Sequence, residues 1–349
     1  MIECLKKATS VQRHCKEREE EKQQKGAQKK DAKKTKKRLA MEQLKKLAAD
    51  LDYDECLAVS TYASNATYIC FRDEKQRPRI GKINLELATG IAMQENKITI
   101  ASIDSITTYN IKVLQKIIDS NDSRQSDTKP IEIGEDYSSR LETGKILCHE
   151  IARTSDDTLF ACNTRYSSIM KINQQTIDKK YWRPKFVTEW CPGDHCHLNG
   201  ICIINNEPAF ATALAATSFE RGWRLFPPEA GVLINTKTNQ IIAKNLNVPH
   251  SPRHFNKMIY VLESGLGSLT VIDPEIGEKE RQIELPAFAR GMAITNEKAY
   301  IGLSKIRNSN LWEKLPVKMK KQPLRASIAK VCLTTNTIED IYELDEKDE

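Results

Sequence analysis

The chain has 349 residues, of which 40% are hydrophobic and 29% are charged. This length allows a large core in one domain or two. No apolar run approaches the length of about 18 residues that a membrane-spanning helix needs, so we expect no such helix. The first 40 residues are crowded with Lys and Glu and lack the apolar segment of a signal peptide, so we expect a cytoplasmic protein.

The net charge of +7 is concentrated at one end of the chain. Residues 1–50 contain 16 Lys and Arg against 8 Asp and Glu, whereas residues 51–349 contain 38 against 39. The body is therefore not built as a nucleic-acid-binding surface. The ten cysteines are scattered and lie mostly in apolar runs, which indicates reduced thiols in a core.

Residues 1–52 form a helical or partly disordered arm in this interpretation. Leu44, Leu47 and Leu51, together with Ala40 and Ala48, make a short apolar stripe at helical spacing. The dense lysines upstream of the stripe favour an electrostatic contact with an acidic partner, either RNA or an anionic membrane surface. The alternative is a solvated helix whose last turns dock on the body. No aromatic residue interleaves the lysines to stack on bases, which favours this alternative.

From residue 54 the hydrophobic period changes from helical to alternating, and a plan of four short strands recurs. The clearest unit runs from Gly200 to Leu246, and its strands are separated by turn residues. Six such units begin near Leu57, Gly90, Glu150, Gly200, Arg253 and Gly291. They average about 48 residues, which is typical of propeller blades. The sequence therefore predicts an all-β fold, a six-bladed β-propeller over residues 54–345 with an acidic tail at 346–349. A pair of β-sandwiches is the alternative, but it predicts no such restarts.

Three segments interrupt the predicted blades. Residues 119–130 are polar and favour a disordered loop. Residues 217–231 carry several aromatic side chains, and residues 305–325 are basic and include Trp312. Long loops of this kind lie over one face of a propeller, where they commonly shape a site.

The strongest functional signal is a constellation at the starts of the innermost strands, which ring one mouth of a propeller's central channel. His149 and Glu150, His197 and Asn199, His250 and Arg253, and Arg290 all fall there, as does His254 in the fifth unit. Four of the six histidines of the chain thus fall at these strand starts, whereas a chance distribution would scatter them along the chain. Imidazole, carboxylate and amide groups that converge in a partly desolvated channel are suited to binding a polar ligand.

Two kinds of chemistry follow from these residue types. Glu150, His197 and Asn199 are candidate ligands for a divalent metal, and His149, Glu150, His197 and His250 are candidate acid–base groups. Arg165, Arg253 and Arg290 would hold an anion, with Asn199 and Trp223 as further ligand contacts. The alternative is that these side chains hydrogen-bond adjacent blades and water, without any chemistry.

Other motifs are weak or missing. One cluster contains residue types that bind zinc: Cys191, His195, Cys196 and His197. A structural zinc site normally has two separated pairs of ligands, and the sequence offers no second pair here. The sequence contains no nucleophile elbow, phosphate-binding loop, dinucleotide fingerprint or zinc-protease helix motif.

Several of these segments resemble a family known as domain of unknown function 4915. The matching stretches are Asn163–Ser167, Trp182–Pro184, Cys196–Gly200, Gly222–Arg224, Pro249–Arg253, Arg290–Gly291 and Gly302–Lys305. The resemblance covers about residues 55–345, leaves the arm outside, and implies a propeller without an established reaction. His149-Glu150 departs from the His-Asp that the family tends to show. Asn199-Gly200 is also similar, more loosely, to the start of an inner strand in gluconolactonase and strictosidine-synthase propellers, where the channel is the site.

The sequence thus predicts a propeller that binds a small polar or anionic ligand at one channel mouth. Metal-assisted or histidine-assisted hydrolysis or isomerisation would follow from that site. The competing hypothesis is a non-catalytic interaction scaffold whose basic arm contacts an acidic partner.

Overall fold

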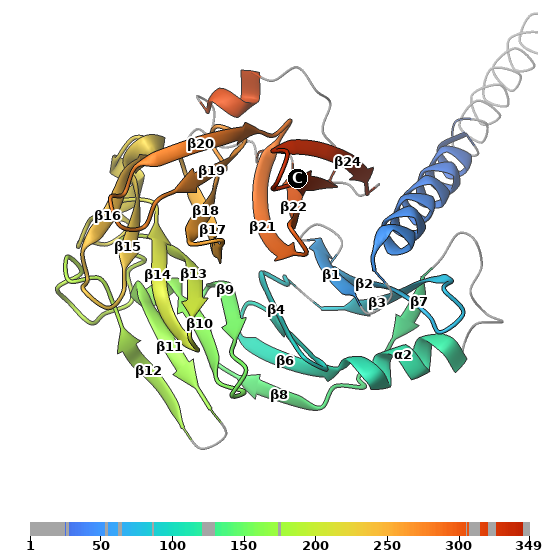
Figure 1. Ribbon diagram of the computed structural model, residues 1–349. Coiled ribbons are helices and arrows are strands. Elements are labelled where there is room, and N and C mark those ends of the chain that lie inside the picture. Colours follow the sequence, from blue (N-terminus) through green and yellow to red (C-terminus); the bar gives the residue numbers. More distant parts are fainter. Residues whose placement is uncertain are drawn as a thin grey trace, which may run out of the picture.

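Six four-stranded sheets surround a central axis, so the body is a six-bladed β-propeller, as predicted (Figure 1). The computed structural model describes residues 25, 28–52, 55–61, 65–85, 87–120, 130–173, 176–304, 306, 315–319 and 326–344. Residues 121–129 of the loop predicted at 119–130 lie outside the described residues, as do most of the 305–325 insertion including Trp312, the acidic tail and residues 1–24.

The four strands of each blade are given below in order from the innermost to the outermost. Blade 1 contains β1 (Cys56–Thr61), β2 (Ala66–Arg72), β3 (Pro78–Asn84) and β7 (Ile131–Ile133), and blade 2 contains β4 (Gly90–Gln94), β5 (Lys97–Ala101), β6 (Ser105–Asn110) and β8 (Ser139–Glu142). Blade 3 contains β9 (Cys148–Arg153), β10 (Leu159–Asn163), β11 (Ser168–Ile172) and β12 (Ile177–Trp182), and blade 4 contains β13 (Leu198–Ile204), β14 (Glu207–Ala213), β15 (Gly231–Asn235) and β16 (Ile241–Leu246). Blade 5 contains β17 (Pro249–Phe255), β18 (Met258–Glu263), β19 (Ser268–Ile272) and β20 (Lys279–Glu284), and blade 6 contains β21 (Phe288–Thr295), β22 (Lys298–Ser304), β23 (Ser327–Cys332) and β24 (Thr337–Glu343).

Blade 1 receives its fourth strand from a segment inserted in blade 2, which was not predicted from the sequence. After β6 the chain forms helix α2 (Ile111–Ser120) and then β7, which pairs in parallel with β3 of blade 1 before the chain returns to blade 2 as β8. Ile111, Leu114 and Ile118 bury one face of α2 against β7, so their helical spacing was the available signal. Blade 1 thus takes its outermost strand from the middle of blade 2.

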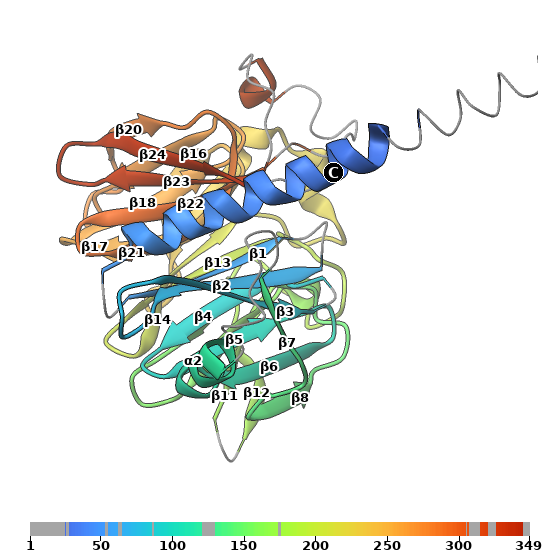
Figure 2. The ribbon, with the colours of Figure 1, turned by 90° about the vertical axis from the view of Figure 1, so that its right-hand side faces the viewer.

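The arm is a helix over residues 28–50, and it lies across the junction between blades 6 and 1 (Figure 2). The predicted stripe is buried: Leu44, Leu47, Ala48 and Leu51 are at most 4% exposed, and Met41 joins them. They pack against side chains of β2 and β3 on one blade and of β22, β23 and β24 on the other. This apolar face closes the seam between the first and last blades.

Polar contacts reinforce the same seam. Lys46 pairs with Asp340 at 2.5 Å, and the Tyr342 hydroxyl donates to Asp50 at 2.5 Å. At the start of blade 1, Glu55 accepts a hydrogen bond from Thr295 of β21 at 2.9 Å. The last two turns of the helix are therefore part of the folded body, while residues 28–39 are exposed.

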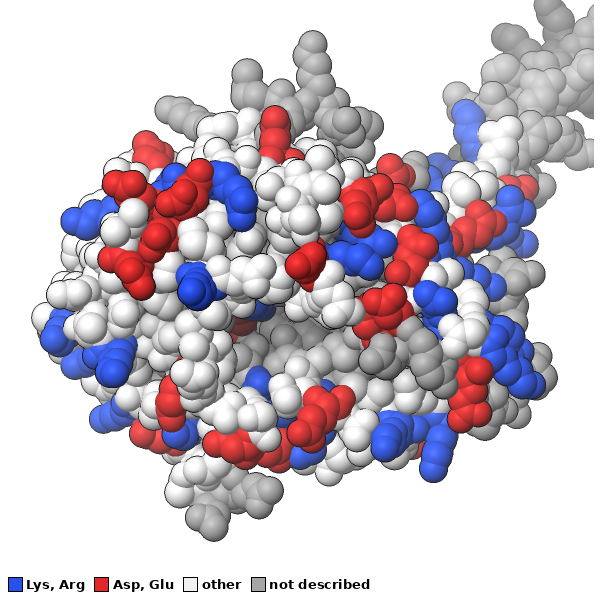
Figure 3. Space-filling model, in the orientation of Figure 1, with Lys and Arg blue, Asp and Glu red and all other residues white. Residues whose placement is uncertain are grey.

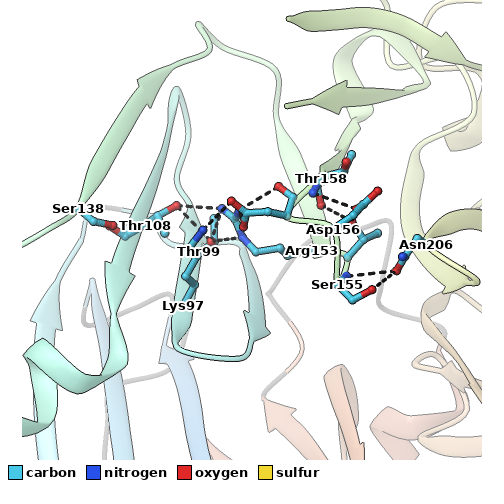
Figure 4. A network of polar contacts seen from close by, with 11 residues as sticks. Lys97, Thr99, Thr108, Ser138, Arg153, Ser155, Asp156, Thr158 and Asn206 are labelled. Carbon is cyan, nitrogen blue, oxygen red and sulfur yellow. Dashed lines mark hydrogen bonds and ion pairs between the residues drawn. The ribbon is translucent and has the colours of Figure 1, made fainter. Parts of the chain in front are cut away.

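The ends of the inner strands far from the predicted mouth are tied together by a polar network (Figure 4). Arg153, the last residue of β9, donates to Thr99 of blade 2 at 3.1 Å and pairs with Asp157 at 2.7 Å. Ser155 donates to Asn206 of blade 4 at 2.9 Å. These bonds hold three consecutive blades in register.

Bulges distinguish the inner strands of four blades. The pairing of the two inner strands shifts at His149–Glu150 in blade 3, at Asn199 in blade 4, at Ser251–Pro252 in blade 5 and at Arg290–Gly291 in blade 6. The inner pairs of blades 1 and 2 have no shift. A bulge leaves a residue unpaired and re-aims its side chain, and bulges are frequent beside functional sites. The four bulges coincide with the predicted constellation.

Every cysteine in the described residues is a free thiol, and most are buried. Burial raises the pKa of Cys148, Cys196 and Cys202 to about 12, which leaves these thiols protonated. They are core residues, as the sequence indicated. None of the helices in the described ranges combines the length and the apolarity that crossing a bilayer requires.

Candidate functional site at the channel mouth

Three of the predicted histidines converge at the starts of the inner strands. The rings of His149 in blade 3 and His197, which leads into blade 4, lie edge to face with centroids 4.6 Å apart. Burial, together with Arg290 and His197, lowers the pKa of His250 of blade 5. Arg290 of blade 6 donates to Nδ1 of His149 at 3.1 Å. Four consecutive blades thus supply one cluster, which we call the mouth cluster: His149, His197, His250 and Arg290. Figure 3 shows one face of the ring, hollowed near its centre, with charges of both signs interspersed over it.

His197 is the most closely supported member of the mouth cluster. Its Nδ1 contacts both carboxylate oxygens of Asp194, at 2.9 and 3.0 Å, and its ring lies 4.4 Å from that of Trp223. The indole N–H of Trp223 donates to the same carboxylate at 3.0 Å. A carboxylate accepts only, so Nδ1 of His197 carries a hydrogen and the lone pair of the neutral ring lies on Nε2.

The local backbone explains why Asp194 reaches its partner. Asp194 and His197 both have positive φ, at 46° and 52°, so the segment turns back on itself before β13. The amides of Gly193 and Asp194 both donate to the carbonyl of Arg165 at 2.9 Å, which fixes the loop against blade 3. Asp194 was not among the residues predicted from the sequence. Its position three residues before His197 was the available signal.

His250 is buried, with an exposed fraction of 6%. Its Nδ1 lies 3.0 Å from the carbonyl of Val248 and 2.8 Å from the hydroxyl of Ser264, and that hydroxyl donates onward to the carbonyl of Ala289. A carbonyl accepts only, so Nδ1–H donates here as well, and Nε2 holds the lone pair. Burial, reinforced by Arg290 and His197, holds the pKa of His250 well below its usual range. This imidazole is neutral at pH 7.

Glu150 and Arg253 form a separate ion pair beneath the mouth cluster. Arg253 donates to Oε1 of Glu150, and the amide of Ile201 donates to Oε2 at 3.0 Å. The guanidinium also donates to the carbonyl of Met292 at 3.0 Å. The pair thus connects blades 3, 4, 5 and 6. Burial raises the pKa of Glu150 against the opposing effect of Arg253. Both side chains are engaged in contacts between blades, so they are not part of the proposed site.

Asn199 is likewise engaged within the ring. Its amide nitrogen donates to the carbonyl of Pro249 at 2.9 Å, and its amide oxygen accepts from Thr212 at 2.8 Å. The predicted metal ligands Glu150, His197 and Asn199 therefore point their donor atoms at different partners. Among the described residues no group of three or more His, Cys, Asp or Glu is arranged to hold a metal ion.

The remaining predicted residues lie around the mouth or away from it. Trp223 is in the mouth, packed against His197, whereas Arg165 is exposed and donates to the carbonyl of Lys145 at 3.2 Å. His254 is exposed near the far end of β17. Cys191 contacts buried His195 at 3.5 Å, in the loop that leads to β13.

The loops that cover the mouth pack on one another. Leu214, Trp223, Val248, Phe288 and Leu315 belong to one apolar cluster drawn from blades 4, 5 and 6 and from the insertion after β22. The 3₁₀ helices η3 (Gly222–Leu225), η4 (Pro228–Ala230) and η6 (Pro316–Met319) lie in these loops, and η2 (Thr164–Tyr166) lies between β10 and β11. Long loops thus cover the mouth on the side of blades 4 to 6.

Comparison with known proteins gives a family but no reaction. Residues 46–348 match the family described as Domain of unknown function (DUF4915), a range that includes the last turn of the N-terminal helix. A search of curated proteins found no match.

Several solved structures are similar to this chain at low sequence identity. A nidogen/laminin complex is 11% identical and has a TM-score of 0.49, with 82% of this chain and 92% of that chain covered. Virginiamycin B lyase from Staphylococcus aureus is 13% identical with a TM-score of 0.43, covering 72% and 75%. The Cps50 (Swd1) β-propeller domain of Myceliophteria thermophila is 8% identical with a TM-score of 0.43, covering 84% and 91%.

Proposed function

Since the chain belongs to the DUF4915 family, whose description names no reaction, we propose a function from the mouth cluster: the protein binds a small anionic ligand there and transfers protons to or from it. One observation carries the proposal. Arg290 donates to His149, the ring of His149 packs edge to face on that of His197, and a carboxylate orients His197.

The guanidinium supplies the anion contact. Arg290 stays charged at all physiological pH values and donates in a planar fork that matches carboxylate and phosphate. It is exposed and lies in the bulge of blade 6, outside the regular strand pairing. His149 beside it adds a second hydrogen-bonding ring.

The two other imidazoles supply the acid–base groups. His197 and His250 each donate through Nδ1 and keep the lone pair of the neutral ring on Nε2, where a proton of a bound ligand can be accepted or hydrogen-bonded. A carboxylate, Asp194, contacts and orients His197, whereas burial and Arg290 oppose protonation of His250. The two rings are thus suited to opposite roles, His197 as the group that takes up a proton and His250 as a neutral partner.

The test is binding of defined anions to the purified protein. Phosphate, acetate, citrate and butyrate are titrated by calorimetry into the wild type, into Arg290→Gln, and into Arg281→Gln as a control on the outer strand β20. We expect at least one anion to bind the wild type and the control alike, with affinity at least tenfold lower for Arg290→Gln. Equal binding by all three proteins would reject the proposal.

A second candidate rests on a different observation. Residues 28–39 of the N-terminal helix are exposed and include Lys29, Lys30, Lys33, Lys34, Lys36, Lys37 and Arg38. This stretch continues beyond the part that packs on the body (Figure 2). We propose that it contacts an acidic partner, in which case binding should weaken steeply with salt and be lost on replacing four of the lysines by Glu.

A further inference from the structure

One edge of the channel mouth is a continuous rim formed by four chain segments. The amide of Arg165 donates to the carbonyl of Ile146 at 3.1 Å, the amide of Gly193 donates to the carbonyl of Arg165 at 2.9 Å, and the amide of Arg221 donates to the carbonyl of Gly193 at 2.8 Å. Blades 3 and 4 both contribute to this rim. We define the rim as residues 145–147, 165, 193–194 and 219–226.

The rim exposes an unusual amount of apolar surface. Leu225 is 79% exposed, Phe219 50%, and Leu147 and Phe226 are each 42% exposed. These are four of the ten large hydrophobic side chains that are exposed in the described residues, and three of them lie within eight residues. Single exposed hydrophobic residues are ordinary, whereas a group of them beside a hollow marks a binding surface.

The apolar side chains are held next to the mouth cluster. Trp223 lies between Phe219 and Leu225 in the chain, and its ring packs 4.4 Å from that of His197. Its backbone amide donates to the carbonyl of His195 at 3.3 Å. The loop is therefore held against the mouth cluster, and its exposed apolar side chains adjoin the imidazoles.

The rim is also basic. Its basic residues outnumber its acidic ones by four to two: Lys145, Arg165, Arg221 and Arg224 against Asp194 and Glu220. The guanidinium of Arg224 lies 5.0 Å from the centre of the Trp223 ring. An occupant of this surface gains from a negative charge near Arg290 and from an apolar part across the rim.

We propose that the ligand of the mouth is an amphiphilic carboxylate: its carboxylate lies against Arg290 and His149, and its hydrocarbon part lies on Leu147, Leu225 and Phe226. This inference rests on the proposed function and adds the class of ligand to it. No covalent step is part of it.

The experiment compares a short and a long probe of the same head group. Butyrate and decanoate, the latter below its micelle concentration, are titrated into the full-length wild type. A Leu225→Ser/Phe226→Ser variant tests the rim. Ile276→Ser is the matched control, because Ile276 is 63% exposed in the turn between β19 and β20 of blade 5. Arg290→Gln tests the head-group contact.

A buried methylene contributes roughly a fourfold gain in affinity. We therefore expect decanoate to bind the wild type and Ile276→Ser at least tenfold more tightly than butyrate, even with only a few methylenes covered. The rim variant should lose that gain and keep its butyrate affinity, while Arg290→Gln should weaken both probes.

Three results would overturn the inference. Equal affinities for the two probes in the wild type would show that the rim does not bind hydrocarbon and would leave anion binding intact. A gain that survives Leu225→Ser/Phe226→Ser would place the hydrocarbon elsewhere. A wild type that sediments as a dimer, with Leu225→Ser/Phe226→Ser monomeric, would assign the rim to a second copy of the chain. If neither probe binds any of the proteins, the wild type included, the proposed function itself is rejected.

Discussion

Glu150 and Arg253 are 103 residues apart in the chain, yet their side chains form an ion pair that reaches from blade 3 to blade 5. The side chain of Glu150 is 7% exposed and that of Arg253 27%. Both residues were candidates for chemistry on the sequence, one as an acid–base group and metal ligand, the other as an anion contact. Their mutual contact and their bonds to Ile201 and Met292 give them a role in holding the ring.

Removing one partner of this pair should be costly. Glu150→Gln leaves the guanidinium without its counter-charge, and we expect a loss of about 2 kcal/mol in the free energy of unfolding, below the range for fully buried pairs because Arg253 is partly exposed. Urea denaturation measures it. The control is Glu207→Gln, an exposed partner of Lys171, which should cost less than about 1 kcal/mol. A loss no greater than that of the control would contradict the structural role.

The N-terminal helix offers a test of seam closure within one element. Leu47 is fully buried between blades 1 and 6, whereas Leu39, two turns earlier, is 42% exposed. Leu47→Ala should destabilise the protein by about 2–5 kcal/mol because it opens a cavity, and Leu39→Ala should change stability by less than about 0.5 kcal/mol. Thermal or urea unfolding gives both values. Similar effects of the two changes would show that the helix does not close the ring.

Acid should destabilise the fold through His250. Its folded-state pKa lies well below the ordinary value near 6.5, so below pH 6.5 the unfolded chain binds a proton that the folded protein does not. Stability is therefore fully present above pH 6.5 and is lost as the pH falls toward the folded pKa. From pH 7.5 to 5.5 we expect the wild type to lose about 1 kcal/mol more than His250→Asn, measured by urea denaturation at each pH. Parallel pH profiles for the two proteins would refute this.

Asp194 should set the tautomer of His197. Asp194→Asn removes the negative charge and replaces one acceptor oxygen by a donor. The Nδ1–H of His197, which contacts both carboxylate oxygens, then faces an N–H group on one side. We expect the Nδ1–H form of His197 to fall in population and stability to drop by about 1–2 kcal/mol. Imidazole ¹⁵N shifts report the tautomer. Asp178→Asn, on the exposed edge strand β12, is the matched control and should leave those shifts unchanged.

The strand plan and the site's location were predictable from the sequence because both depend on local patterns. Alternation with period two and turn residues at regular intervals indicated all six inner strands, and His149, His197, His250 and Arg290 lie where the repeat placed them. The apolar stripe on the N-terminal helix was equally readable, since Leu44, Leu47 and Leu51 share one helix face.

Only the tertiary structure decided which polar residues are engaged with one another. No local pattern relates Glu150 to Arg253, or β7 to blade 1, because those pairings depend on how distant segments meet around the ring. The role of Asp194 depends likewise on a loop with two residues at positive φ, whose conformation is fixed by the carbonyl of Arg165 in the preceding blade. Sequence periodicity determined the blades and the ring of candidates, whereas contacts between blades determined which candidates face the mouth.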